Sequence, residues 1–414
     1  MDSQLRDLLD AAVGEPPHRV SVEAVHRRVI RRRVLECVAA GAAVAVIAVI
    51  VSASIGAFGR GSGPGPSAGR QRPVVPTVYV SSNGPDGGMV IPIPIATNTP
   101  GTPIKVGGYP GQIAITPNGR TAYVAGLDST SVTPISTATN TAGKPIKVGR
   151  GPYHIAITPD GKTAYVTNEI SGTVTPITIA TSKAGKPIKV GNGPVGIVIT
   201  PDSKTAYVTN QNSGTVTPIR TATNTPEAPI SVGGIAAGSA ITPDGKTVYV
   251  ASERLGTVTP ITTATNTAGK PIKVGLGPAQ IAITPDGKTA YVTNRASGST
   301  TPITTVTNTA GKPIKVGRSP YDIAITPDGK TAYVGNLGSG TVTPITIATG
   351  QAGKPIKVGR GLSGPVGIVI TPDSKTAYVL TLSPGPIIPI ATATGTPGTP
   401  ISVGSMPHAM AITP

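Results

Sequence analysis

Polar and aromatic side chains at two adjacent positions, just before a repeated phrase, are the residues that could bind a ligand or do chemistry. The phrase, IAITPDGKTAYV and its variants, is preceded in several copies by tyrosine, histidine, aspartate or glutamine. Two tyrosine faces, two amides, an imidazole and a carboxylate are suited to holding a polar ligand such as a sugar or a peptide. The predicted ligand-binding residues are Gln112, Tyr153, His154, Gln280, Tyr321, Asp322 and His408.

These residues do not form a recognisable catalytic set. His154 and His408 are the only histidines after residue 72, and Cys37 is the only cysteine, so no Ser/His/Asp or Cys/His arrangement is available. Together with Asp322 the two histidines are possible metal ligands, but they belong to three separate repeats and lack the short spacings of metal sites. We therefore expect binding rather than catalysis, with no catalytic residue, no metal and no cofactor.

The elements that position these residues recur with a fixed period. Tyr-Val pairs are spaced by 44 residues, then by 42 five times, then by 45. Each unit holds four β-like runs, IAIT, TAYVTN, GTVTPITIAT and KPIKVG, and the Pro-Asp-Gly-Lys link between the first two favours a tight hairpin. Four antiparallel strands per 42 residues predict one blade of a β-propeller.

The composition also favours an all-β protein. The 414 residues include 53 Gly, 44 Pro, one Phe and no Trp, and the chain is rich in Thr, Val and Ile. A single cysteine excludes an intrachain disulfide. Closure of a large fold must therefore come from strand pairing.

The repeated words resemble those of a known family. YVTN at residues 165–168, 207–210 and 291–294, preceded by TPDGK or TPDSK and followed by variants of SGTVTPI, is similar to the YVTN family of β-propeller repeat proteins over residues 77–414. That family is associated with extracytoplasmic and surface-layer proteins, and related propellers include lactonases and redox enzymes. The resemblance implies an exported binding or structural module. The alternative is a lactonase-like hydrolase, or another propeller enzyme, with its site in the central channel.

The chain ends indicate the number of blades. Residues 77–106 supply the last three strands of a unit, and AMAIT at residues 409–413 is a first strand with nothing after it. The two fragments complete each other, which predicts eight blades closed by the C-terminal strand, with seven as the alternative. Near-identical words four repeats apart, such as PVGIVITPDSKTAYV at Pro194 and Pro365, indicate a duplicated half-ring. The candidate residues should then lie just before the innermost strands, at the mouth of the channel.

The first 76 residues have a different character. Apolar residues at helical spacing predict two short amphipathic helices in a cytoplasmic segment, 1–33. Residues 34–58 form an apolar run that would extend about 37 Å as a helix, enough to span a bilayer core of about 30 Å. Arginines at 31–33 orient the amino terminus to the cytoplasm. A cleaved signal peptide is the alternative to this anchor, and segment 1–33 either signals inward or only fixes topology.

This organisation places the protein in the cell membrane as a single-pass protein. Residues 59–76 have the composition of a flexible linker, and the propeller, 77–414, would be extracellular. The expected partner is a cell-envelope polymer or a surface protein, and the protein is expected to be a monomer.

The net charge of +17 belongs mainly to the repeats, because residues 73–414 hold 25 Lys/Arg against 12 Asp/Glu, or +13. The word GKPIKVG places pairs of lysines on the outermost strand of several units. Charge on an exposed edge discourages aggregation, and it also attracts anionic polymers; both readings are open. Nucleic acid is disfavoured by the predicted location and by the absence of aromatic residues among the lysines.

Overall fold

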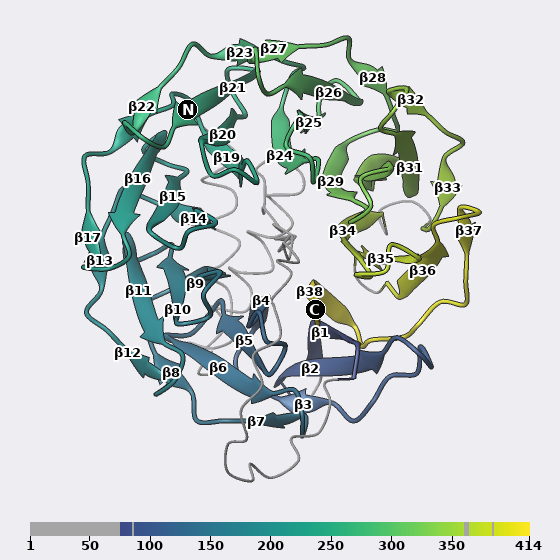
Figure 1. Cartoon of the computed structure of the whole chain (residues 1–414). Helices are drawn as coiled ribbons and strands as arrows, with labels where there is room; N and C mark the ends of the chain where they lie inside the picture. Colours follow the sequence, from purple (N-terminus) through teal and green to yellow (C-terminus); the bar gives the residue numbers. More distant parts are fainter. Residues whose placement is uncertain (1–74, 85–86, 360–363, 383–384) are drawn as a thin grey trace, which may run out of the picture. The chain divides into compact units, whose positions relative to one another are not determined.

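An eight-bladed, all-β propeller is formed by the residues described in the computed structural model, 75–84, 87–359, 364–382 and 385–414 (Figure 1). This confirms the predicted fold, and eight blades replace the alternative of seven. The predicted cytoplasmic helices, transmembrane helix and most of the linker lie outside the described residues. Within the described part of the chain, no helix is long and apolar enough to cross a membrane.

Each blade is an antiparallel sheet whose strands follow one another outward from the centre of the ring in chain order, except that the inner strand of blade 1 is the C-terminal strand. The inner strands, taken from blade 1 to blade 8, are β38 (Met406–Ile412), β4 (Pro110–Ile115), β9 (Pro152–Ile157), β14 (Pro194–Ile199), β19 (Ala236–Ile241), β24 (Pro278–Ile283), β29 (Pro320–Ile325) and β34 (Pro365–Ile370). The second strands are β1 (Thr77–Gly84), β5 (Thr121–Gly126), β10 (Thr163–Asn168), β15 (Thr205–Asn210), β20 (Thr247–Ser252), β25 (Thr289–Asn294), β30 (Thr331–Asn336) and β35 (Thr376–Thr381).

The third strands carry the TVTPIT words, and the outermost strand is broken into very short segments. The third strands are β2 (Gly87–Pro94), β6 (Ser131–Ser136), β11 (Thr173–Thr178), β16 (Thr215–Arg220), β21 (Thr257–Thr262), β26 (Ser299–Thr304), β31 (Thr341–Thr346) and β36 (Ile387–Ala391). The outer segments are β3 (Ile104–Lys105), β7 (Thr141–Ala142), β8 (Ile146–Lys147), β12 (Lys183–Ala184), β13 (Ile188–Lys189), β17 (Thr225–Pro226), β18 (Ile230–Ser231), β22 (Thr267–Ala268), β23 (Ile272–Lys273), β27 (Thr309–Ala310), β28 (Ile314–Lys315), β32 (Gln351–Ala352), β33 (Ile356–Lys357) and β37 (Thr396–Pro397). One 3-10 turn, η1 (Leu337–Ser339), follows β30.

The two ends of the described chain close the ring within blade 1. Strand β38 pairs antiparallel with β1, as the sequence predicted. The backbone N–H of Thr77 donates to Oγ1 of Thr413 at 2.8 Å, and the N–H of Thr413 donates to the carbonyl of Thr77 at 3.0 Å. Strand β1 therefore has a partner on both sides, and blade 1 is completed to four strands.

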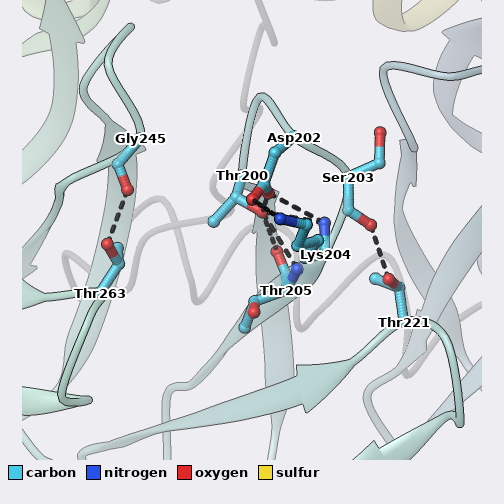
Figure 2. Close-up of polar contacts among 8 residues, drawn as sticks. All are labelled: Thr200, Asp202, Ser203, Lys204, Thr205, Thr221, Gly245 and Thr263. Atoms are coloured by element: carbon cyan, nitrogen blue, oxygen red, sulfur yellow. Dashed lines mark hydrogen bonds and ion pairs between the residues drawn. The ribbon is translucent and has the colours of Figure 1, made fainter.

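The predicted hairpin between the first two strands is confirmed in atomic detail. In blade 4, Thr200 Oγ1 donates to Asp202 Oδ1 at 2.6 Å, and the N–H of Lys204 donates to the same oxygen at 3.0 Å (Figure 2). The residue after the aspartate adopts the left-handed region of backbone conformation, which favours glycine. In blade 4 this residue is Ser203, with φ of 61°. Its carbonyl accepts a bond from the Thr221 hydroxyl at 2.6 Å. The repeated aspartates are thus turn residues.

The apolar core lies between neighbouring blades. Side chains alternate along a strand, so Tyr123 and Ala125 of β5 pack towards blade 3, while Ala122 and Val124 pack towards blade 1. The same division recurs around the ring, and each junction has its own cluster of Val, Ile, Ala and Tyr. The sequence of the second strand therefore specifies a two-sided core.

A tyrosine hydroxyl also crosses most junctions. Tyr165 donates to Asn224 Oδ1 at 2.7 Å, and Tyr378 of blade 8 donates to Asn98 of blade 1, so the bond recurs where the ring closes. The accepting asparagines sit in turns with φ near 55°, a region that asparagine tolerates. Opposite Tyr291 this turn carries Gly350 instead.

Substituting Tyr378→Phe should lower the free energy of unfolding by about 1 kcal/mol, because it removes one partly buried hydrogen bond across the closing junction. Thermal or urea unfolding of the full chain measures the effect. Tyr291→Phe is the matched control, since its hydroxyl makes no hydrogen bond within the described residues. Equal losses in the two variants would show that the inter-blade bond contributes nothing.

Candidate functional site

One face of the ring carries both the loops after the second strands and the loops that lead into the inner strands. A repeated backbone bond ties the two kinds of loop together; Glu169 donates to Gly151 at 2.8 Å, and Arg295 donates to Gly277 at 2.8 Å. We call this surface the loop face. It is where the sequence predicted a ligand site.

The predicted site residues lie inside the inner strands rather than before them. The strands begin at the preceding proline in six blades, so the predicted residues fall on β4, β9, β24, β29 and β38, which belong to five different blades. Most of these side chains are buried, and His154 and Asp322 are each only 1% exposed. The sequence pattern predicts a later strand start, because a register irregularity lies at this point.

At that irregularity a side-chain hydroxyl of the second strand, in place of a backbone carbonyl, accepts the hydrogen bond from the N–H of the inner strand. In blade 3 the N–H of His154 donates to Oγ1 of Thr167 at 3.0 Å, and in blade 6 the N–H of Gln280 donates to Oγ1 of Thr293 at 3.0 Å. Ser81 does the same for Ala409 in blade 1. The hydroxyl at this position of the second strand is therefore a structural part of the blade.

Blade 7 lacks this hydroxyl, because Gly335 replaces the threonine. Asp322 lies opposite this glycine, and its Oδ2 accepts a bond from the backbone N–H of Ile368 in blade 8 at 2.7 Å. Burial raises the pKa of Asp322 to about 7, although backbone N–H donors from Ile368 and Ile323 act to lower it. Asp322 is thus a buried bridge between two blades.

Gln280 also lies at a blade junction. A Cβ built on Gly238 of blade 5 would lie 2.3 Å from Oε1 of Gln280, so only glycine leaves room for this amide. Gln112 occupies the same position of β4 and is 8% exposed. Both glutamines are consequently largely withdrawn from solvent.

His408 packs against an aromatic ring that the sequence did not single out. Its imidazole lies 4.3 Å from the ring of Tyr109, centroid to centroid, at an interplanar angle of 62°. Burial lowers the pKa of His408 to about 4. The imidazole is therefore neutral at neutral pH, and its Nε2 has no hydrogen-bond partner within the described residues.

A second cluster on the loop face combines Tyr321 with two charged residues that the sequence reasoning missed. Arg295 Nη1 lies 3.7 Å from Glu253 Oε1, and the Arg295 guanidinium lies 5.4 Å from the centroid of the Tyr321 ring. The Arg295 and Glu253 side chains are only 12% and 17% exposed. Burial raises the pKa of Glu253, while Arg295 and then Arg254 act to lower it. The cluster joins blades 5, 6 and 7.

Glu253 and Arg295 belong to a series of equivalent positions on the loop face whose residue type differs between blades. The residue four places after the tyrosine of each second strand is polar in blades 3 to 6 and leucine in three of the other four. From blade 1 to blade 8 the residues are Asn83, Leu127, Glu169, Gln211, Glu253, Arg295, Leu337 and Leu382. This position, directly after YVTN, is the signal that would have revealed the cluster from sequence. Among the described residues, no group of three or more His, Cys, Asp or Glu could hold a metal ion.

The fold and these loops define a protein of the β-propeller class, and the sequence defines its family. The family model described as "Lactonase, 7-bladed beta-propeller" matches residues 110–267 and 183–372. The two matches together span more than half of the chain, so the chain belongs to this family, although its ring has eight blades. No curated protein matches the chain in sequence.

Several solved structures share the fold. Dihydro-heme d1 dehydrogenase NirN, in complex with DHE, is 15% identical with a TM-score of 0.71, over 84% of this chain and 77% of that chain. AztD of Citrobacter koseri, in its apo form, is 14% identical with a TM-score of 0.61, over 81% and 97%. Hydrazine synthase of Kuenenia stuttgartiensis is 23% identical with a TM-score of 0.55, over 72% and 96%. At these identities the likeness shows the fold alone.

Replacing Asp322→Asn should remove a pH dependence of stability. The folded pKa of about 7 lies above the ordinary value of 3.8, so the stability that Asp322 contributes is full below pH 4 and is lost as the pH rises through about 7. Urea unfolding between pH 4 and 8 should show the wild type losing up to about 1.4 kcal/mol per pH unit relative to the variant. His408 titrates with the opposite sign, but it cancels in the difference because both proteins carry it.

Asp373→Asn is the control for this experiment. Hydrogen bonds from Thr371 and Lys375 lower the pKa of Asp373, so its contribution is present above the ordinary value and is lost only at lower pH. Its stability curve should run parallel to that of the wild type between pH 5 and 8. A parallel curve for Asp322→Asn as well would contradict a protonated Asp322.

Proposed function

We propose that this protein is a binding module of the cell surface, held in the membrane by one N-terminal helix with its amino terminus in the cytoplasm. The propeller would present its loop face to a polar ligand, either a protein or peptide or a glycan of the cell envelope. Support for the location comes from residues 31–58, where arginines precede a long apolar run. Support for binding comes from the loop face.

The observation that carries the proposal is the Glu253–Arg295–Tyr321 cluster. At the equivalent position three other blades use leucine, so the fold itself does not need a charge there. A largely buried ion pair stabilises a protein less than well-packed apolar residues do, because both charges lose their water. A guanidinium that pairs with a carboxylate and lies over a tyrosine face is, in contrast, well suited to a polar or acidic ligand.

The predicted site residues have two different roles in this proposal. Tyr321 is part of the cluster, and Tyr153 occupies the same position in blade 3, half-buried, where its ring can add contact area. His154, Asp322, Gln112 and Gln280 are buried in the inner strands and would support the loops that hold the ligand. His408 with Tyr109 would form a separate aromatic edge on blade 1.

A lactonase-like hydrolase is the second candidate, and one observation favours it besides the family. Glu253 combines a raised pKa with a neighbouring guanidinium. In a lactone hydrolysis Glu253 would accept the proton of the attacking water, and Arg295 would stabilise the negative charge that develops on the carbonyl oxygen. The ring C–O bond then breaks and the leaving oxygen takes the proton back from Glu253. The new carboxylic acid ionises, so the product carries a hydroxyl and a carboxylate and one proton is released.

The double variant Glu253→Leu, Arg295→Leu tests both candidates without changing the net charge. Leucine occupies this position in blades 2, 7 and 8, so the variant should fold and be at least as stable as the wild type. We expect the full chain to bind isolated cell-wall material at about 0.15 M salt, and the variant to bind it at least tenfold more weakly. Co-sedimentation measures the bound fraction.

Asp160→Asn, Lys162→Gln is the control, because it also removes one ion pair, in an exposed hairpin. Unaltered binding by the leucine variant would reject the loop face as the site. Release of acid from a simple sugar lactone, measured by pH-stat, separates the candidates: turnover by the wild type that the leucine variant lacks would favour the hydrolase.

A further inference from the structure

The outer rim of the propeller is a second charged surface, separate from the loop face. Twelve lysines lie on or between the outer segments, and all are exposed: Lys105, Lys144, Lys147, Lys183, Lys186, Lys189, Lys270, Lys273, Lys312, Lys315, Lys354 and Lys357. We call these the rim lysines. None of them forms an ion pair within the described residues.

The other lysines of the propeller are already neutralised. Six lie in the hairpins between first and second strands, and each pairs with the aspartate of its turn, as Lys162 does with Asp160 at 3.4 Å. In the outer segments of the described chain, Glu227 is the only acid, and it pairs with Arg220 and accepts a bond from Asn266. The net charge of the propeller is therefore concentrated on the rim.

The rim is continuous from blade to blade. Outer segments of successive blades are in contact, as β8 is with β12 and β13 is with β17, and they follow the circumference of the ring (Figure 1). The apolar residue of each Ile-Lys pair is largely buried and the lysine points outward. The charges are thus held on a fixed backbone.

Two interruptions divide the rim lysines into two arcs. Blade 4 has Ala228 and Ser231 at the lysine positions, and blade 8 has Thr399 and Ser402. Blades 1 to 3 carry six rim lysines and blades 5 to 7 carry the other six. Protection of an exposed edge would require charge on all eight blades, so edge protection alone does not explain the pattern.

Grooves between adjacent outer strands give the arc of blades 1 to 3 a shape. One groove of about 620 Å³ lies between blades 2 and 3, and its lining includes Lys144, Lys147 and Lys183 together with Thr181 and Ser182. A second, of about 430 Å³, lies between blades 1 and 2 and is lined by prolines, threonines and Asn140. Such grooves can take successive units of a chain that carries hydroxyl groups as well as charge.

We propose that the two arcs of rim lysines together bind one linear anionic polymer, laid along the circumference of the propeller so that a single chain spans both arcs. A flat anionic surface can meet only a short stretch of a circular rim, whereas a flexible polymer can follow a whole arc. Lysine ammonium groups act as point charges and accept phosphate or carboxylate alike, since no planar fork constrains the geometry. The shared chemistry of the ligand is therefore a row of negative charges on a flexible chain.

Two sextuple variants of the full chain, kept in a non-ionic detergent, test this. The rim variant changes to glutamine the six lysines of blades 5 to 7: Lys270, Lys273, Lys312, Lys315, Lys354 and Lys357. The hairpin variant makes the same change at Lys162, Lys204, Lys246, Lys288, Lys330 and Lys375, so both lose six charges. The probes are fluorescently labelled long-chain polyphosphate and polygalacturonate, followed by anisotropy.

The expected result is at least tenfold weaker binding of the preferred probe by the rim variant at about 0.1 M salt, against less than threefold for the hairpin variant. Affinity should fall steeply with salt, since several counterions are released together. The probe that binds more tightly identifies phosphate or carboxylate as the source of charge. The Glu253→Leu, Arg295→Leu variant should bind both probes normally, so failure here and failure of the proposed function are distinguishable.

Three outcomes would overturn the proposal. Equal weakening by the two variants would mean that net charge alone drives the binding. Competition by inorganic phosphate at millimolar concentration would indicate separate small-anion sites. Binding to vesicles of anionic lipid that depends on the rim lysines as strongly as polymer binding does would assign the rim to a membrane surface.

Discussion

The burial of a tyrosine of each second strand between its own blade and the next is the interaction on which this ring depends. Tyr207 reaches Asn266 at 2.5 Å, and Tyr249 reaches Asn308 at 2.6 Å. The aromatic ring fills the junction while the hydroxyl finds a polar partner near the surface, so one residue supplies both apolar burial and orientation. Because the chain has no disulfide within it, such contacts and the pairing of β38 with β1 must hold all eight blades.

Because the strands supply the packing between blades, the loop face can carry partly buried charges that do not stabilise the fold. Packing between blades is supplied by the second and third strands, where Val, Ile and Tyr are fully buried. The loops above them add little to this core, and a partly buried ion pair such as Glu253–Arg295 is tolerated there. Asp322 shows the limit of the same tolerance, since its buried carboxyl needs backbone donors from its own blade and the next.

The repeated words contain most of the fold. Strand type, hairpin chemistry, blade number and ring closure follow from a 42-residue period and from the two incomplete units at residues 77–106 and 409–413. The exact start of the inner strands does not, because Thr167 and Ser81 replace backbone partners across an irregularity that has no signature in a single repeat. The candidate site was only partly predictable: Tyr321 was identified, while Arg295 emerged only when the structure placed it over that ring. Contacts between side chains of different blades depend on the conformations of neighbouring loops, and the period of the repeat does not predict those conformations.

The composite construction of blade 1 has a mechanical consequence. The described chain enters the ring at Thr77, and β1 is held on one side by β2 and on the other by β38. A pull on the chain ahead of Thr77 acts along the axis of β1, so the two ladders of hydrogen bonds are loaded in shear and must fail together, whereas a strand peeled from an edge loses its bonds one at a time. Strand β1, with which the described chain enters the ring, is therefore also well suited to resist a mechanical force applied through the residues that precede it.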